Sequence, residues 1–564
     1  METKLYGEIA PGGKWAALLL LGALAVYVPG LWTYELSDSE SKYAEIPREM
    51  VESGDWVAPS IDYVPYLTKP PLTFWITSLA YKVGGVNPFT GRLPNAIFAI
   101  ALAFVIGAIG RTLFGTRAST ISTLLALTTA EFYVYTRECG VEMCLLFFTA
   151  LVHHCFLRWQ RTEKRKWLRG AWASAAAAVL AKGPIGILFP FLSILIYLFV
   201  TGQRGQFRRL FSWVGILCFL GIALPWPIAM GIRNPDFFWF ALVHETWYRI
   251  IGQRLPNDAL FPTGRFLLLF LGEFYPWVQH VPHALGRAWK EGRSSYEGHC
   301  IAYLLAWAVV PLVVFSLSAS KVDFYGLHSY PGLILLVAWL WDKQIAGGER
   351  APSRVGMAMT FLVSGALAAA SWCAVTFQPN AQWIRDLDLP PSDAVTRFLI
   401  IAMVGNFAAG ALLLRGRPRA ALALIAAMMF GFFAIAQVRF ASLTEADSMH
   451  FATLDYRAAM GKDTVLVSDE RPEFAHVAIL PFYVKAPCYV LRNGKNSQLV
   501  FHDRDPRRGR VIDEAELVEW VHKGMIVFLV GEREKTEARL VRLGLRYKRQ
   551  SSTIDRAVYR IGGE

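Results

Sequence analysis

Carboxylates and lysines lie close together in one long polar segment near the N-terminus. Asp38, Glu40 and Lys42 follow one another within five residues, and Lys69 stands directly before two prolines. A carboxylate can take a proton from an acceptor hydroxyl, while a lysine can hold an anionic leaving group. These residue types therefore suit a group-transfer reaction in which an anion departs.

Several charged residues of the same segment have a simpler explanation. Glu45, Arg48 and Glu49 are spaced as on one helix, where charged side chains usually face solvent, so we expect them to solvate an amphipathic helix. For Lys69 the corresponding alternative is a side chain that reaches from the edge of a membrane span towards the interface.

The rest of the sequence is that of an integral membrane protein. Of 564 residues 54% are hydrophobic and 18% are charged, whereas soluble domains carry roughly 25% charged residues. The net charge of +13 does not indicate nucleic-acid binding, because Lys and Arg cluster in short loops, such as 158–169 and 204–209, as in cytoplasmic loops. The seven cysteines form no CxxC pair and no metal-like spacing.

Long apolar blocks predict a polytopic α-helical bundle in lipid. A window of about 19 residues gives about 13 candidate transmembrane helices. They lie at 15–32, 93–112, 118–136, 141–157, 170–183, 185–201, 210–231, 263–281, 299–317, 328–342, 356–376, 396–414 and 420–438. Residues 70–83 are too few to cross and predict a re-entrant or interfacial helix, and 170–183 is expected to pair with the next span as a tight hairpin.

Residues 1–438 therefore form a transmembrane domain and 439–564 a small soluble domain. Basic loops placed in the cytoplasm put the N-terminus there, and an odd number of spans puts the C-terminal domain outside, beside the long first loop at 33–92. In the C-terminal domain, strands are predicted at 464–468, 488–491, 525–530 and 557–561, and helices at 512–522 and 535–543. This α/β domain carries no phosphate-binding glycine motif.

Further ionisable residues fall on the same predicted side as the first loop. Arg137 and Glu142 flank a turn between spans, and Lys182, Arg249 and Tyr325 lie in other external turns. Each ionisable residue at membrane depth costs roughly 2.5–3.5 kcal/mol on insertion, so such residues tend to mark a site. Together they outline a polar cavity between the bundle and the first loop.

These motifs, in this order, resemble the aminoarabinose transferases. This group lies within the C superfamily of membrane glycosyltransferases, which also includes the protein O-mannosyltransferases. The matching stretches are Tyr43-Ala44-Glu45-Ile46, Ser53-Gly54-Asp55-Trp56, Lys69-Pro70-Pro71, Gly91-Arg92-Leu93-Pro94, Lys182-Gly183-Pro184, Pro225-Trp226, His244-Glu245 with Arg249, and Ser320-Lys321 with Tyr325.

The resemblance implies an inverting glycosyltransferase that uses a polyprenyl-phosphate sugar on the periplasmic side of the bacterial inner membrane. Family residues that hold the donor phosphate match Lys69 and Arg249, and a further donor contact matches Tyr325. Family tyrosines that line the cavity match Tyr43 and Tyr66. The acceptor class left open is a lipid such as lipid A, another glycan or a protein.

This sequence departs from the family pattern at the catalytic base and at a metal ligand. The family base begins an Asp-Glu-x-Arg run about thirty residues before the lysine, a count that lands on Ser39. Asp38 and Glu40 flank Ser39, and we favour Asp38 as the base. Lys42 replaces the family arginine, which removes its two-pronged hydrogen-bonding geometry.

Two more positions differ. The second family carboxylate is usually Asp, and the aligned residue here is Glu142. The aminoarabinose transferases carry a Glu linked to a metal where this chain has Thr68, so no metal ligand is assigned and a divalent metal is left open.

Two other readings of the sequence remain. A secondary transporter or flippase of a lipid-linked or small polar substrate would need internal repeats and paired broken helices, and no convincing repeat is found. A non-catalytic membrane scaffold would explain Ser39, but Asp38, Lys69 and Arg249 argue against it.

Overall fold

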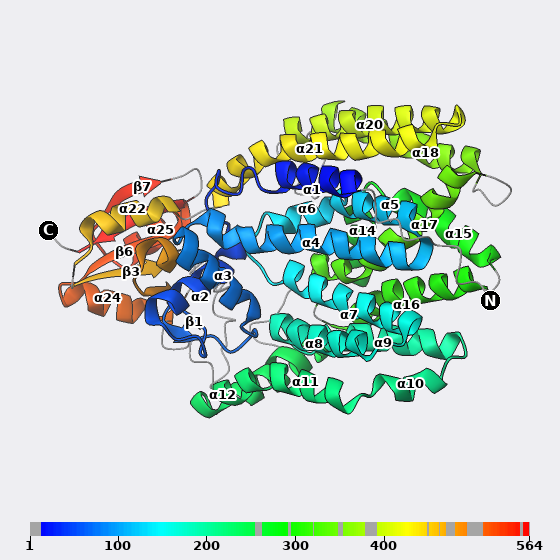
Figure 1. Ribbon diagram of the computed structural model, residues 1–564. Helices are drawn as coiled ribbons and strands as arrows, with labels where there is room; N and C mark the ends of the chain where they lie inside the picture. The colour runs from blue at the N-terminus through cyan, green and yellow to red at the C-terminus, as the bar shows by residue number, and fades with distance from the viewer. Residues whose placement is uncertain are drawn as a thin grey trace.

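The computed structural model describes most of the chain. The described residues are 13–253, 262–291, 295–319, 321–347, 353–377, 392–447, 450–461, 463–469, 480–492, 511–552 and 556–562. Figure 1 shows helices that run side by side along the long axis of the molecule, with a small sheet domain at one end.

The helical part is built from long apolar helices and shorter elements between them. Its helices, with bounds, are α1 Gly13–Tyr27, α2 Asp38–Ser53, α3 Leu72–Gly84, α4 Pro88–Phe114, α5 Thr116–Leu127, α6 Ala130–Thr136, α7 Glu142–Thr162, α8 Arg165–Lys182, α9 Ile185–Val200, α10 Gly205–Leu210, α11 Trp213–Ala223, α12 Pro225–Arg233, η1 Trp239–Trp247, α13 Tyr248–Ile251, α14 Thr263–Glu273, η2 Val278–His280, α15 Val281–Lys290, α16 Tyr296–Leu317, η3 Asp323–Ser329, α17 Tyr330–Ala346, α18 Arg354–Phe377, α20 Ser392–Leu414, α21 Pro418–Asp447 and α22 His450–Ala459.

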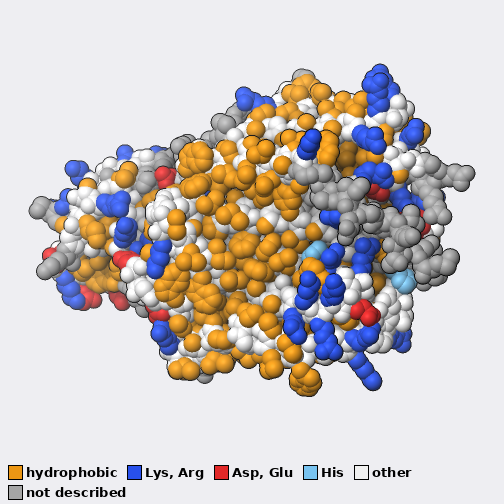
Figure 2. Space-filling model, viewed as in Figure 1, with side chains coloured by type: hydrophobic (Ala, Val, Ile, Leu, Met, Phe, Trp, Pro, Cys, Tyr) orange, Lys and Arg blue, Asp and Glu red, His pale blue; other side chains and the backbone are white. Residues whose placement is uncertain are grey.

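The fold is that of a multi-pass membrane protein. Among the described residues, six helical segments are long and apolar enough to cross a bilayer, and Lys14–Tyr27 and Ile185–Val200 are shorter apolar helices. The expected number of 13 is therefore not confirmed. Figure 2 shows apolar side chains covering the middle of the visible face, with Lys and Arg at both ends and most densely at the end away from the sheet domain. This pattern is typical of a protein that spans a membrane with its basic loops on one side.

Two expected spans are each divided into two helices, for different reasons. The expected span 118–136 is two helices, α5 and α6, since the Trp277 indole and the Thr129 hydroxyl both donate to the Leu125 carbonyl, at 3.0 and 2.9 Å. The expected span 210–231 is divided into α11 and α12 at Pro225, which supplies no backbone N–H.

The expected hairpin of α8 and α9 is confirmed. Gly183 ends α8 with a φ of +91°, a conformation that favours glycine, and Pro184 precedes α9. The two helices pack at very close range at Gly186, where an added Cβ would lie 2.4 Å from the carbonyl carbon of Ala178. This contact fixes the end of α8 that carries Lys182.

The first loop folds onto the end of the bundle. Helix α2 begins with a capping box between Ser37 and Glu40, and α3, with 13 residues, is too short to cross a bilayer, as expected. Between them lies a two-stranded hairpin, β1 Ser60–Ile61 and β2 Val64–Pro65.

Glu45, Arg48 and Glu49 of α2 are buried, so the expectation that these three residues solvate a helix is wrong. Arg48 forms a two-pronged pair with Glu45 at 2.6 and 2.7 Å, and both side chains are almost inaccessible to solvent. Glu49 accepts a hydrogen bond from the Tyr63 backbone N–H at 3.0 Å and another from the Ser60 hydroxyl. These groups fasten the β1–β2 hairpin to α2, a long-range role that helical spacing cannot reveal.

The C-terminal domain is a six-stranded sheet in the order β5-β4-β3-β6-β8-β7. Its described elements are β3 Thr464–Ser468, β4 Cys488–Leu491, β5 Val511–Ile512, α24 Glu514–His522, β6 Ile526–Glu532, α25 Arg533–Arg542, β7 Tyr547–Ser552 and β8 Arg556–Ile561. Strands β3 to β6 pair in parallel and β8 runs antiparallel to both β6 and β7. The four predicted strands and both predicted helices are confirmed, while β5 and β7 are additional.

The C-terminal domain packs on the first loop. The backbone N–H of Cys488 donates to Asp62 Oδ1 at 2.8 Å, and the Leu36 N–H donates to the Tyr483 hydroxyl at 3.1 Å. Leu36 and Ala44 share one apolar cluster with Phe482. The first loop and the C-terminal domain therefore lie at the same end of the helical bundle (Figure 1), as the sequence predicts.

Replacing Gly186 by Ala should destabilise the α8–α9 hairpin. The added methyl would collide with the backbone of Ala178, and overpacking of this kind costs about 1–3 kcal/mol. Thermal unfolding in detergent measures the effect. The matched control is Gly221→Ala in α11, where nothing lies within 4 Å of the new methyl and no loss is expected. Equal unfolding temperatures for the two variants would contradict this account of the hairpin.

Candidate active site

Two cations from distant parts of the chain meet at one carboxylate oxygen. Lys69, in the turn before α3, places Nζ 3.6 Å from Glu245 Oε2. Arg249 in α13 places Nη2 3.2 Å from the same oxygen. The Lys69 and Glu245 side chains are 15% and 6% exposed, so this cluster is largely shielded from solvent.

Tyr325 completes the polar side of this cluster. Arg249 Nη1 donates to the Tyr325 hydroxyl at 2.9 Å, so the guanidinium is held at both of its terminal nitrogens. The Tyr325 ring stacks on Phe315 at a centroid distance of 4.0 Å and is 5% exposed. Because the ring is fixed by packing, its hydroxyl is a fixed hydrogen-bonding group.

A second ion pair lies on the other side of Tyr325. Lys182, at the end of α8, forms an ion pair with Glu142, the first residue of α7. The Lys182 ammonium also lies 5.4 Å from the centroid of the Tyr325 ring, within the range of a cation–π contact. Glu142 is buried, and its Oε2 has no hydrogen-bond partner in the structure.

Aromatic residues of the first loop pack together beside these ionic clusters. The Tyr43 ring stacks on Phe74 at 6.3 Å, and Tyr66 meets the same ring edge-on at 6.1 Å. Burial raises the pKa of the Tyr43 hydroxyl well above its usual value, and the nearby Glu142 raises it further while Arg249 lowers it. Tyr43 therefore lies within electrostatic reach of both ionic clusters.

The structure thus brings together seven of the nine site residues predicted from the sequence. They are Lys42, Tyr43, Tyr66, Lys69, Glu142, Arg249 and Tyr325. Lys42 lies at the rim, where its ammonium is 5.1 Å from the Tyr43 ring centroid.

Two further residues belong to the same site. Glu245 and Lys182 stand in sequence motifs of the resemblance, and Lys182 was expected to border the polar cavity, but neither was assigned a role in catalysis or phosphate binding. In the sequence, each is an ionisable residue in a motif that matches the family. Only the folded chain shows that each forms an ion pair with a predicted site residue.

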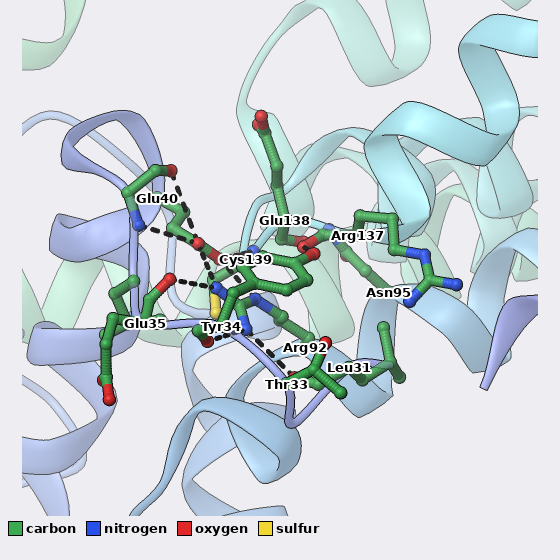
Figure 3. Close-up of polar contacts among 12 residues, drawn as sticks. Leu31, Thr33, Tyr34, Glu35, Glu40, Arg92, Asn95, Arg137, Glu138 and Cys139 are labelled. Atoms are coloured by element: carbon green, nitrogen blue, oxygen red, sulfur yellow. Dashed lines mark hydrogen bonds and ion pairs between the residues drawn. The ribbon is translucent and has the colours of Figure 1, made fainter. Parts of the chain in front are cut away.

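Glu40 lies in a separate cluster, shown in Figure 3, where both of its carboxylate oxygens are occupied. Arg92 donates to Oε1 from Nη2 at 2.5 Å and to Oε2 from Nε at 3.0 Å. The backbone N–H of Cys139 donates to Oε2 at 2.9 Å, and that of Ser37 to Oε1 at 3.0 Å. A carboxylate engaged in this way has little capacity left to accept a proton from a substrate.

Arg92 uses its other hydrogens to hold the polypeptide of the first loop. It donates to the carbonyl oxygens of Leu31, Tyr34 and Glu35 at 2.9–3.0 Å, and its guanidinium lies 3.9 Å from the centroid of the Tyr34 ring. The Glu40–Arg92 pair is therefore a structural brace between α2 and α4. The other candidate base, Asp38, begins α2, and its side chain lies outside the described part of the chain.

Arg137 was expected to line the cavity, but its side chain instead makes hydrogen bonds at the end of α1. It donates to the carbonyl oxygens of Pro29 and Val26 at 2.6 and 3.0 Å and to the Gln437 side chain at 3.2 Å. It therefore joins the end of α1 to α21 and stands apart from the ionic clusters of the site.

Within the described ranges no group of three or more His, Cys, Asp or Glu side chains comes together. Thr68, at the position where the resemblance implies a metal-linked carboxylate, supplies only a hydroxyl. His244 and Glu245 lie 3.5 Å apart but have no third partner of this kind.

Comparisons with known proteins place the fold of this multi-pass membrane protein beside that of membrane glycosyltransferases. Residues 68–228 match the family model described as dolichyl-phosphate-mannose-protein mannosyltransferase. This segment contains Lys69, Glu142 and Lys182 of the site.

Individual relatives point to one branch of these proteins. The chain is 29% identical to undecaprenyl phosphate-alpha-4-amino-4-deoxy-L-arabinose arabinosyl transferase 1 of Pseudomonas fluorescens over 355 residues, 60% of this chain and 62% of that protein. It is 27% identical to the corresponding transferase of Edwardsiella ictaluri over 374 residues, 63% of this chain and 64% of that protein. The matches thus span less than two thirds of these relatives.

A solved structure extends the likeness along the whole chain. The crystal structure of ArnT from Cupriavidus metallidurans bound to undecaprenyl phosphate superimposes with a TM-score of 0.81, covering 97% of this chain and 98% of that one at 24% identity. The same protein in the apo state gives 0.80. The resemblance to the aminoarabinose transferases is therefore confirmed, and the fold is theirs.

Replacing Glu40 by Gln should destabilise the protein more than it disturbs chemistry. The change leaves Arg92 buried with an uncompensated charge, at a cost of about 3–5 kcal/mol. Thermal unfolding in detergent is the measurement, and Glu519→Gln is the matched control, because that carboxylate is 58% exposed and its partner Lys523 is exposed as well. A Glu40→Gln protein as stable as the wild type would contradict the structural role.

Proposed function

We propose that this protein is an inverting glycosyltransferase that moves a sugar from a polyprenyl-phosphate donor to an envelope acceptor. The observation that carries the proposal is the convergence of Lys69, Arg249 and Tyr325 at the end of the bundle where the first loop packs. Two cations and a phenol from three distant segments form a site suited to a phosphate at a membrane surface.

Lys69 and Arg249 would stabilise the leaving group. As the bond between the anomeric carbon and the phosphate oxygen breaks, its electron pair passes to the phosphate, where negative charge accumulates. Fixed cations aimed at that charge lower the barrier because they need no rearrangement during the reaction. With this charge supplied by side chains and with Thr68 in place of a carboxylate, we assign no metal to the reaction.

Asp38 would be the catalytic base. The acceptor oxygen attacks the anomeric carbon on the face opposite the phosphate, and its proton passes to the carboxylate. The saturation of Glu40 by Arg92 and two backbone N–H groups favours Asp38 over Glu40. Lys42 and Glu142 would support the site from the rim and from α7, and Tyr43 and Tyr66 would line it.

The donor would enter sideways from the bilayer. A polyprenyl chain partitions into hydrocarbon, so a site at the end of an apolar bundle needs no nucleotide-binding fold to capture it. We further propose that this end faces the periplasm of the bacterial inner membrane, because the opposite end carries the basic loops (Figure 2).

The names of the relatives suggest the donor lipid. They are undecaprenyl phosphate-dependent aminoarabinose transferases, and one solved relative binds undecaprenyl phosphate. We propose undecaprenyl phosphate as the carrier here, with lipid A, another envelope glycan or a protein as the acceptor class. Because Ser39, Lys42 and Thr68 depart from the family pattern, we leave open whether this protein transfers the same sugar as its relatives.

Removing either cation should abolish most of the transfer. Lys69→Ala and Arg249→Ala are each expected to lower the rate of sugar transfer from a radiolabelled undecaprenyl-phosphate donor by about 10²-fold or more, since each removes charge stabilisation of the leaving phosphate. Lys82→Ala is the control, because that ammonium contacts the ring of Trp56 and lies outside the site. Unchanged transfer in both site variants would exclude this phosphate clamp.

Asp38→Asn should reduce transfer by about 10²-fold or more, because the amide cannot take the acceptor proton. Asp38→Glu, which keeps a carboxylate, is the matched control for the role of the base. Full activity in Asp38→Asn would remove Asp38 from the mechanism. Transfer that is absent in the wild type and appears in Ser39→Asp would mean that the natural site is disabled.

A further inference from the structure

Glu245 lies at the centre of the two cations assigned to the donor phosphate. A single oxygen, Oε2, lies 3.6 Å from Lys69 Nζ and 3.2 Å from Arg249 Nη2. An anionic oxygen that bridges two cations in this way stands at the point a phosphate oxygen would take. Lipid phosphate and this carboxylate therefore compete for the same two positive charges.

We propose that Glu245 is an internal competitor that holds Lys69 and Arg249 together and helps to expel the lipid phosphate product. This inference rests on the function proposed above. It assigns Glu245 a positioning role, because the carboxylate acts on the cations and not on the reacting atoms.

The charges of substrate and product explain why such a competitor is useful. The sugar-linked donor is a phosphodiester with one negative charge, whereas the polyprenyl phosphate left behind is a monoester with a charge of about −1.5 to −2 at neutral pH. Two fixed cations would hold this product more tightly than they hold the donor. Product release would then limit turnover, as it does in many enzymes.

The surroundings of Glu245 offer the displaced carboxylate a second position. Its other oxygen, Oε1, lies 3.5 Å from Nδ1 of His244, and that buried imidazole has no hydrogen-bond partner on either ring nitrogen. A small rotation of the Glu245 side chain towards His244 would satisfy the ring and free the cations. Both residues lie in η1, a π-helix, and such segments are frequent at functional sites.

The test compares binding of undecaprenyl phosphate by the wild type and by Glu245→Gln. The amide keeps the size of the side chain and removes its charge. Purified full-length protein in nanodiscs should bind the radiolabelled lipid phosphate about tenfold more tightly when Glu245 is Gln. The gain is expected because the phosphate no longer competes with a carboxylate for the two cations. Glu519→Gln, which removes an exposed carboxylate of α24, should bind like the wild type.

Turnover supplies a second readout. In Glu245→Gln the rate should fall more steeply than in the wild type between the first round of transfer and the rounds that follow, because the lipid phosphate product leaves more slowly. Glu245→Asp, which keeps the charge on a shorter side chain, should fall between the two proteins in both measurements. It also keeps the test decisive if the Gln variant does not fold.

The outcomes separate this inference from the function on which it rests. Equal or weaker binding of the lipid phosphate by Glu245→Gln, or by Glu245→Asp where only that variant folds, would overturn the competitor role and leave the transferase standing. The proposed function itself would be overturned if the wild type did not bind undecaprenyl phosphate, or if Lys69→Ala bound it as tightly as the wild type.

Discussion

The buried pair of Arg92 and Glu40 is the interaction on which the external end of this protein depends. A guanidinium and a carboxylate, 0% and 1% exposed, are stable there only because nearly every hydrogen-bonding position is used. Arg92 comes from a membrane-spanning helix and its partners lie in and just before the first loop, while Glu40 also accepts from the Cys139 N–H at the turn after α6. One ion pair therefore fixes where α2 starts and, through α2, where Tyr43 and the hairpin lie.

The candidate site is assembled on this support from segments that are far apart in the sequence. Lys69 precedes α3, Glu142 begins α7, Lys182 ends α8 and Arg249 follows η1. Each is placed by a helix end, where side chains can reach into the space beyond the bilayer without a break in the helical hydrogen bonds. The close packing of α8 on α9 and the stacking of Tyr325 on Phe315 fix the positions of Lys182 and Tyr325 at these ends.

Much of this arrangement could be predicted from the sequence, because apolar blocks and strand patterns are local signals. The membrane class, the α8–α9 hairpin, the first loop as a folded unit and the strands β3, β4, β6 and β8 follow from such signals. The break between α5 and α6 does not, since it depends on the distant Trp277. Pairings such as Arg48 with Glu45, Lys69 with Glu245 and Lys182 with Glu142 also depend on the fold. Spacing alone therefore misjudged the burial of α2 and could not show which residues Glu245 and Lys182 contact.

The seam between the C-terminal domain and the first loop limits how this protein can be recombined. Asp62 and Leu36 of the loop are bonded to residues 488 and 483 of the domain, across more than four hundred positions of the chain. A chimaera that exchanged only the C-terminal domain with that of a relative would leave these loop groups facing foreign partners. The unit to exchange intact is therefore the domain together with the loop.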